Sequence, residues 1–252
     1  MTTVVERPAL PHIQVLGFAV HDLGMDGALD AIDTFIAEGS PHIVVTADSS
    51  MLVMAQHDEE LAAILRKAAL VTVDSAGVLW AARRNGASLR TRVSGVELVE
   101  QLCKHSQQRG IRLYFLGSAP GIAQGAAAEM ERRYPGAVMV GAYHGYYPAE
   151  EEQLVCDEVR RARPDVLCVA MGIPRQEKWI NQHQNEIGVP VAIGVGGTFD
   201  VLSGSVRRAP RWIQSARLEW LWRTLANPKK AHKAALLPRF VVMNLLRRRN
   251  GC

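Results

Sequence analysis

Short apolar runs alternate with amphipathic segments along the first 200 residues of the chain. The runs are rich in valine, isoleucine and leucine, which is typical of strands buried on both faces of a sheet. They predict strands over residues 43–46, 70–73, 112–116, 138–141, 166–170 and 191–193. Apolar residues spaced three or four apart predict helices over residues 51–67, 76–84, 96–108, 121–134, 150–161 and 176–186.

Strands that alternate with helices predict an α/β fold. Parallel neighbours in a sheet need long crossover connections, and each predicted helix can supply one. We therefore expect a mainly parallel sheet with helices on both of its faces.

Charge divides the chain into two unequal parts. Residues 1–206 carry 17 lysines and arginines against 24 acidic residues, a net charge of −7. Residues 207–252 carry 12 lysines and arginines against Glu219 alone, a net charge of +11. A shift of this size predicts an α/β catalytic domain over residues 1–206 and a basic C-terminal appendage over residues 207–252.

The basic segment also holds aromatic and aliphatic side chains, among them Trp212, Trp220 and Trp222. Basic residues interleaved with tryptophan and leucine suit an anionic membrane surface, where the apolar side chains enter the lipid and the cations meet the headgroups. A packed pair of terminal helices with a solvated basic face is the main alternative. Nucleic acid is the least favoured partner, because the body is net negative and carries no nucleic-acid-binding motif.

Several classes of protein are disfavoured. The chain has no run of 18 apolar residues, and its first 40 residues contain no continuous apolar h-region, so we expect neither a membrane-spanning helix nor a signal peptide. Cys103, Cys156, Cys168 and Cys252 lie far apart, which suits a reducing compartment better than a disulfide framework. Without a histidine pair or an Asp-x-Asp string, no metal site and no cofactor is expected.

The residues that could take part in catalysis or binding follow the predicted strands. In an open parallel sheet, ligands bind beyond the carboxyl ends of the strands. Thr46, Asp74, Gly117, Gly172 and the loop from Gly194 end or follow such strands. We therefore expect these positions to lie along one edge of the sheet.

Two glycine-rich loops lie at this edge. Gly117 and Ser118 open a Gly-Ser-Ala-Pro-Gly loop before a helix, which suits a phosphate or simply a tight turn. The second loop has three glycines within four residues, at Gly194, Gly196 and Gly197. Such a cluster indicates either that the backbone closely approaches a ligand or that the loop is an ordinary flexible one.

Three polar residues each allow two interpretations. Asp74 can be a general base or the N-cap of the following helix. Thr46 can belong to an active site or reflect the preference of threonine for strands. Arg92 can bind a diphosphate through its guanidinium or lie on a solvated surface.

Longer strings appear in a fixed order. They include Gly-x-Pro-x-Gln-Glu-x-Trp at 172–179, Gly-Gly-x-Phe-Asp at 196–200 and Arg-Ala-Pro at 208–210. Together with Thr46, Asp74 and residues 92–95, 115–118, 141–146, 218–223 and 227–230, they resemble the WecG/TagA/CpsF glycosyltransferases, glycosyltransferase family 26. The resemblance runs from about residue 13 to about residue 240.

The resemblance implies a Rossmann-like body with a helical appendage, and an inverting, metal-independent transfer from a UDP-sugar to an undecaprenyl-diphosphate-linked glycan. The sugar would be N-acetylmannosamine, its uronic acid or glucose. It further implies a peripheral protein on the cytoplasmic face of the inner membrane, engaged in the synthesis of cell-surface polysaccharide. It leaves open whether the chain forms a homo-oligomer.

The resemblance also assigns roles to single residues. Asp74 matches a catalytic base, Thr46 an active-site threonine and Arg92 a polar donor-site residue. The nucleotide and donor would contact Gly117, Ser118, Gly145, Gly172, Gln176, Gly196, Gly197 and Asp200. The acceptor diphosphate and the membrane would contact Asp48, Arg223, Lys230 and Lys233. Asp48 replaces a usual asparagine, and the two lysines replace usual arginines, so the bidentate fork of arginine is lost there.

Two other functions compete with this interpretation. An NAD-type oxidoreductase would need a Gly-x-Gly-x-x-Gly turn after its first strand, and no such turn is present. A non-catalytic membrane adaptor that binds a nucleotide would release no UDP from any sugar donor.

Overall fold

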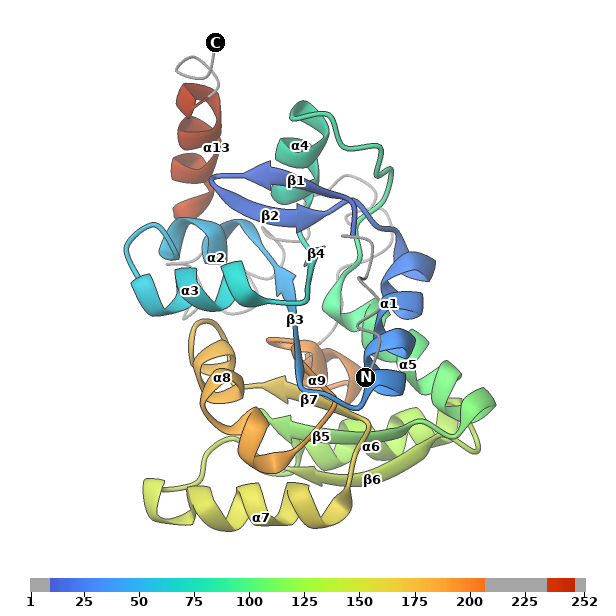
Figure 1. The fold of residues 1–252 in the computed structure, drawn as a ribbon. Coiled ribbons are helices and arrows are strands. Elements are labelled where there is room, and N and C mark those ends of the chain that lie inside the picture. The colour runs from blue at the N-terminus through green and yellow to red at the C-terminus, as the bar shows by residue number, and fades with distance from the viewer. Residues whose placement is uncertain (1–9, 207–234, 248–252) are drawn as a thin grey trace, which may run out of the picture.

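The structure is a computed structural model that describes residues 10–206 and 235–247. Its centre is a six-stranded parallel sheet in the order β4-β3-β8-β7-β5-β6 (Figure 1). The strands are β3 (His42–Ala47), β4 (Leu70–Val73), β5 (Arg112–Gly117), β6 (Val138–Tyr143), β7 (Val166–Ala170) and β8 (Val191–Gly194). The prediction of an α/β, Rossmann-like fold with a mainly parallel sheet is confirmed.

The order of the strands reverses near the middle of the sheet. From β3 the chain moves outward to β4, crosses to β5 and β6, and returns through β7 and β8 to pair with β3. Because all six strands are parallel, their carboxyl ends meet at one edge. Such a reversal leaves a crevice beyond these ends, which is the usual ligand site of this class of fold.

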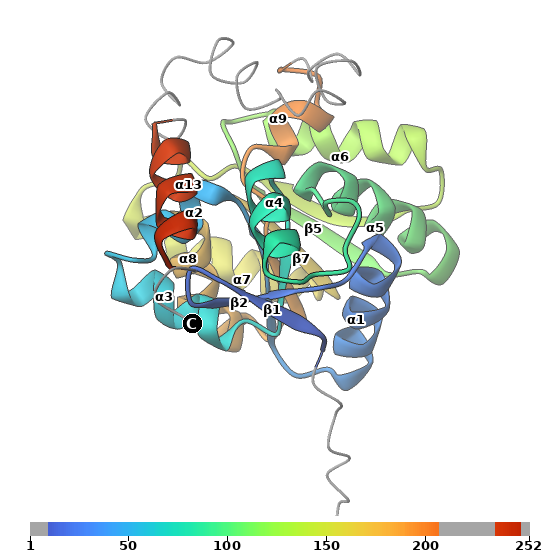
Figure 2. The same cartoon turned by 90° about the horizontal axis from the view of Figure 1, so that it is seen from above.

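Helices cover both faces of the sheet (Figure 2). On one face pack α1 (Met25–Glu38), α5 (Gly95–Arg109), α6 (Ile122–Arg133) and α9 (Thr198–Leu202). On the other pack α7 (Glu152–Ala162), which follows a 3₁₀ turn at Ala149–Glu151, and α8 (Arg175–Ile187). Phe115 of β5 stacks on Phe199 of α9 with ring centroids 4.5 Å apart, and both side chains are fully buried.

A third apolar cluster covers the β3–β4 end of the sheet. It joins the hairpin β1 (His12–Val15) and β2 (Phe18–His21) to α2 (Ser49–Met54), α3 (Glu59–Lys67), α4 (Ala76–Arg84) and α13 (Leu236–Arg247). The hairpin protects the edge strand β4, because the amide of Val71 donates to Nδ1 of His21 at 2.9 Å.

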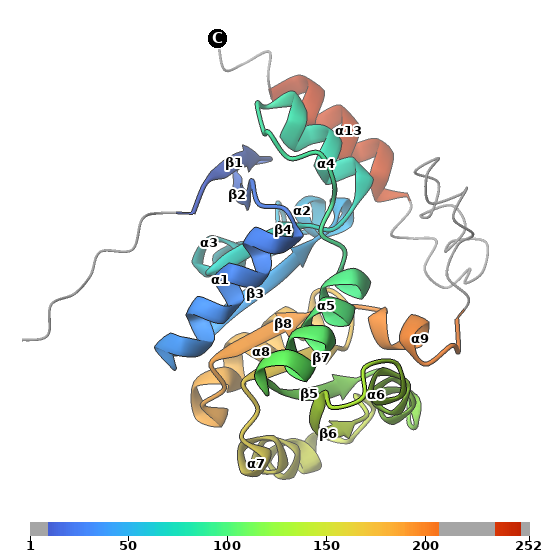
Figure 3. The same ribbon diagram turned by 90° about the vertical axis from the view of Figure 1, so that its right-hand side faces the viewer.

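The described part of the predicted appendage, α13, packs on the body beside α2 and α4 (Figure 3). Phe240 is fully buried within the third cluster. At its far end, Arg247 reaches the β1–β2 turn, where a Cβ built on Gly17 would lie 2.7 Å from the guanidinium. Within the described residues, no helix is long and apolar enough to cross a membrane. The division at residue 206 stays a prediction.

Two local predictions differ from the structure, and some elements were not predicted. The single helix expected over residues 51–67 is wrong, because Oδ1 of Asp58 accepts from the amide of Leu61 at 3.0 Å and caps a separate helix, α3. The β1–β2 hairpin and α1 were not predicted. The loop expected after Gly194 contains α9, which begins at Thr198.

Gly117 lets the ends of two strands approach each other closely. Its φ is +132°, and a Cβ at this position would lie only 2.4 Å from the carbonyl oxygen of Ala170 on β7. The neighbouring amide of Ser118 donates to that same oxygen at 2.7 Å. A side chain at position 117 would therefore push apart the carboxyl ends of β5 and β7.

Replacing Gly117 with alanine should lower the free energy of unfolding by roughly 2–4 kcal/mol, from backbone strain and steric overlap. Denaturant unfolding followed by circular dichroism measures this. The matched control is Gly125→Ala in α6, where a Cβ would make an ordinary 3.5 Å contact with Ser203 and alanine favours the helix. Equal stability of the two variants would contradict the proposed close approach.

Candidate active site

Asp74 lies directly beyond β4, at the carboxyl edge of the sheet. Its amide donates to the carbonyl of Ala47 at 3.1 Å, which ties the end of β4 to the end of β3. The following segment returns along the same strand, because the amide of Val93 donates to the carbonyl of Val73 at 2.8 Å. This return brings Arg92 to the site, with Nη1 3.5 Å from the carbonyl oxygen of Asp74.

The carboxylate of Asp74 accepts a hydrogen bond from the first turn of α5. The amide of Gly95 donates to its Oδ1 at 2.8 Å. Ser94 caps the same helix, with its hydroxyl accepting from the amide of Glu97 at 3.3 Å. The N-terminus of a helix carries partial positive charge, which favours an anionic carboxylate there. This half-buried carboxylate is thus held in a defined position.

The alternative in which Asp74 caps the following helix is wrong. The N-cap of α4 is Ser75, whose hydroxyl accepts from the amide of Val78 at 3.3 Å. The carboxylate of Asp74 points instead to α5, some twenty residues further along the chain.

Two threonine hydroxyls converge on Gly95. Thr46 is buried and donates to the carbonyl of Gly194 at 2.7 Å, across the β3–β8 junction. Thr198 donates to the carbonyl of Val195 at 2.6 Å. A Cβ built on Gly95 would lie 3.1 Å from Oγ1 of Thr198 and 3.7 Å from Oγ1 of Thr46. Glycine at this position therefore allows β3, β4, the loop after β8 and α5 to meet.

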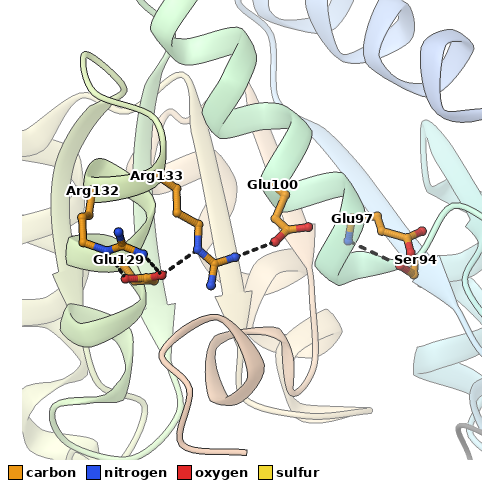
Figure 4. A network of polar contacts seen from close by, with 6 residues as sticks. All are labelled: Ser94, Glu97, Glu100, Glu129, Arg132 and Arg133. Atoms are coloured by element: carbon orange, nitrogen blue, oxygen red, sulfur yellow. Dashed lines mark hydrogen bonds and ion pairs between the residues drawn. The ribbon is translucent and has the colours of Figure 1, made fainter. Parts of the chain in front are cut away.

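Ion pairs on the outer side of α5 join it to α6 (Figure 4). Glu100 of α5 pairs with Arg133 at 3.1 Å, and Arg133 and Arg132 both donate to Glu129, at 2.6 and 2.8 Å. The hydrogen bonds from Arg132 and Arg133 lower the pKa of Glu129 to about 2. Exposed pairs of this kind add little to the stability of the fold.

Gln176 joins the loops that follow β7 and β8. Its side chain is 1% exposed, and its Oε1 accepts from the amides of Gly172 at 3.1 Å and Gly196 at 2.9 Å. Its Nε2 donates to Oε1 of Glu177 at 2.6 Å, and a Cβ on Gly194 would lie 2.7 Å from that nitrogen. The predicted donor-site glutamine is therefore buried, where it sets the positions of two predicted backbone contacts.

Gly117, Ser118 and Gly145 also lie together, at the ends of β5 and β6. The amide of Gly145 donates to the carbonyl of Ser118 at 2.9 Å. Ser118 is buried and has a φ of 57°. The loop leads to Gly121, the N-cap of α6, which supplies no side-chain cap to the helix. The first turn of α6 is consequently suited to an anionic group such as a phosphate.

The remaining predicted residues are more scattered. Asp48 caps α2, with Oδ1 accepting from the amide of Met51 at 2.8 Å. Asparagine is an equally good cap, so the aspartate preserves this local contact. Gly197 is exposed just before α9, and Asp200 is half-buried within it. The predicted diphosphate residues Arg223, Lys230 and Lys233 lie outside the described residues.

Some residues of the site were not assigned a role from the sequence. Ser94 and Glu97 form the Ser-x-x-Glu string that often marks the start of a helix, and this signal could have located the first turn of α5. Thr198 and Ser75 carry no comparable signal, because their roles depend on hydrogen bonds that only the folded chain defines.

Comparison with known proteins gives a consistent result. The model of the Glycosyl transferase WecG/TagA/CpsF family matches residues 13–251. Relatives from Staphylococcus aureus strains NCTC 8325 and COL are named N-acetylglucosaminyldiphosphoundecaprenol N-acetyl-beta-D-mannosaminyltransferase. Each is 29% identical over 241 residues, covering 95% of this chain and 94% of the relative.

The family match spans almost all of the chain, including the strands and loops that form the site. It favours the transferase over an oxidoreductase or a non-catalytic adaptor. The chain belongs to the Glycosyl transferase WecG/TagA/CpsF family and is a glycosyltransferase.

Proposed function

We propose that the protein transfers a sugar from a UDP-sugar to a sugar carried on undecaprenyl diphosphate, with inversion and without a bound metal ion. The observation that supports this most is the carboxylate of Asp74, held at the start of α5 beside Thr46 and Arg92. The relatives are named for N-acetylmannosamine transfer to a diphosphoundecaprenol-linked N-acetylglucosamine. UDP-N-acetylmannosamine is accordingly the first donor to test, before its uronic acid and UDP-glucose.

The proposed reaction is a single displacement. The acceptor hydroxyl attacks the anomeric carbon, and the bond between that carbon and the UDP oxygen breaks. Asp74 takes the proton from the hydroxyl as the new glycosidic bond forms. The nucleophile enters opposite the leaving group, so the configuration at the anomeric carbon inverts.

Negative charge grows on UDP as it leaves. In the absence of a metal ion, cations and backbone amides must stabilise this charge. Arg92 beside Asp74, the first turn of α6 and the loop at Gly196 and Gly197 lie at the same edge of the sheet. We assign the leaving diphosphate to these groups. Arg223, outside the described residues, is a further cation expected from the family resemblance.

Replacing Asp74 with asparagine should reduce turnover by about 100-fold or more and leave UDP affinity nearly unchanged. Asparagine retains an oxygen that can accept from the amide of Gly95, so the local structure is preserved. UDP release from several UDP-sugars with a short-chain lipid-diphosphate acceptor measures turnover, and calorimetry measures UDP binding.

Asp26→Asn on the exposed first turn of α1 serves as the control and should behave like the unmodified protein. Unchanged turnover in Asp74→Asn would refute the assignment of Asp74 as the base. The same assay, run with each donor in turn, identifies the sugar.

We further propose that α13 helps the protein bind peripherally to the cytoplasmic face of an anionic membrane. Its outward side chains include Val242, Leu245 and Leu246, which are 53%, 40% and 55% exposed. Arg239 and Arg247 on the same helix are also exposed. Each cation near an anionic surface contributes about 1 kcal/mol, which adds to the burial of the apolar side chains in the lipid.

Replacing Val242, Leu245 and Leu246 together with serine should weaken binding to anionic liposomes at least about tenfold, because three apolar side chains no longer enter the lipid. Co-sedimentation over a range of lipid concentrations measures this. Leu154→Ser on α7, at a site 63% exposed, is the control and should bind normally. Equal sedimentation of the triple variant and the unmodified protein would exclude α13 as the contact.

A further inference from the structure

A cavity of about 300 Å³ lies between α2 and α13. Its lining combines three apolar side chains with three polar or charged ones. Its lining residues are Val53, Met54, His57, Asp58, Leu236 and Arg239. The cavity is separate from the hydrogen-bonded groups around Gly95.

Arg239 brings a cation to this cavity. Its Nη2 lies 2.6 Å from Nε2 of His57. Since a guanidinium can only donate a hydrogen bond, His57 is the acceptor. Within residues 10–206 and 235–247, no carboxylate forms an ion pair with Arg239. A guanidinium in this setting is well suited to an oxygen pair of a phosphate.

Asp58, the acidic residue that lines the cavity, already forms other contacts. Oδ1 of Asp58 accepts from the amide of Leu61, and Oδ2 lies 2.9 Å from Nζ of Lys178. The hydrogen bonds from Leu61 and Lys178 lower the pKa of Asp58, so the carboxylate stays ionised near neutral pH. Lys178 also pairs with Glu60 at 2.9 Å. These three charges form their own group on the α3 and α8 side, and among the described lining residues Arg239 is the cation on the α13 side.

The cavity lies close to the candidate active site. Helix α2 begins at Ser49, whose hydroxyl lies 3.1 Å from that of Ser75, the residue after Asp74. Leu237 reaches the same place, since a Cβ on Gly77 would lie 3.3 Å from its Cδ1. The cavity lies near the other end of α2, so it is roughly 10 Å from the strand ends, given a rise of about 1.5 Å per helical residue.

We propose that this cavity holds the junction between the diphosphate and the first isoprene units of the lipid-linked acceptor. Arg239 would bind the phosphate that carries the lipid, and Val53, Met54 and Leu236 would pack against the isoprene units. This inference rests on the proposed function for the nature of the acceptor. A sugar ring and a diphosphate would bridge the interval between Asp74 and the cavity.

The outer face of α13 fits the same occupant. Val242 and Leu246 follow Arg239 at intervals of three and seven residues, which places them on one side of the helix. Both are exposed. A polyprenyl chain that leaves the cavity therefore passes along apolar side chains on the face assigned to the membrane.

Calorimetric titration of the full chain with farnesyl diphosphate tests the proposal. We expect binding that Arg239→Ala weakens about tenfold or more, because a charge-assisted hydrogen bond is lost, and that Arg239→Lys weakens less. Inorganic diphosphate should bind the unmodified protein much more weakly than farnesyl diphosphate, since it cannot use the apolar wall. Arg161→Ala on the exposed surface of α7 is the control and should bind normally.

Farnesyl diphosphate affinity that is unchanged in Arg239→Ala would overturn the proposal. Equal affinity of the unmodified protein for farnesyl and inorganic diphosphate would also overturn it, by indicating a site for free diphosphate. In a transfer assay, Arg239→Ala should raise KM for the lipid-linked acceptor and leave KM for the UDP-sugar unchanged. Because calorimetry requires no sugar transfer, a protein that binds farnesyl diphosphate through Arg239 but releases no UDP would refute the proposed function alone.

Discussion

The hydrogen bond from the amide of Gly95 to the carboxylate of Asp74 joins the end of β4 to the first turn of α5. The rest of the site is arranged around this bond. Thr46 spans the junction of β3 and β8 through the carbonyl of Gly194, and Thr198, the first residue of α9, lies against Gly95. The reversal of strand order thus becomes a place where a half-buried carboxylate, two hydroxyls and the N-terminus of a helix meet.

Helix α13 packs beside this arrangement and is the element that the proposed function directs toward the lipid. It packs through Phe240 on the same apolar cluster as α2 and α4, and these two helices begin at the carboxyl edge of the sheet. Its opposite side exposes Val242, Leu245 and Leu246. In the proposed membrane-bound state, helices that pack against one another would therefore link the lipid contact to the site.

The sequence predicted the six central strands because each is an apolar run, and it predicted Asp74 and Thr46 because each ends or follows one of these runs. The break between α2 and α3 was missed because capping by Asp58 competes with a continuous helical pattern. The position of Gln176 was not foreseeable, since its partners are backbone amides of loops 4 and 20 residues away. Counting charges identified a basic segment, but only the folded chain places α13 against α2 and α4.

A crystal structure of the protein with UDP would test the central claim most directly. We predict that the diphosphate lies at the carboxyl edge of the sheet, between the loops at Gly117 and Gly196, with the carboxylate of Asp74 facing the position of the anomeric carbon. UDP bound at the opposite end of β3, in the cavity of about 170 Å³ lined by His42 and Lys67, would contradict it.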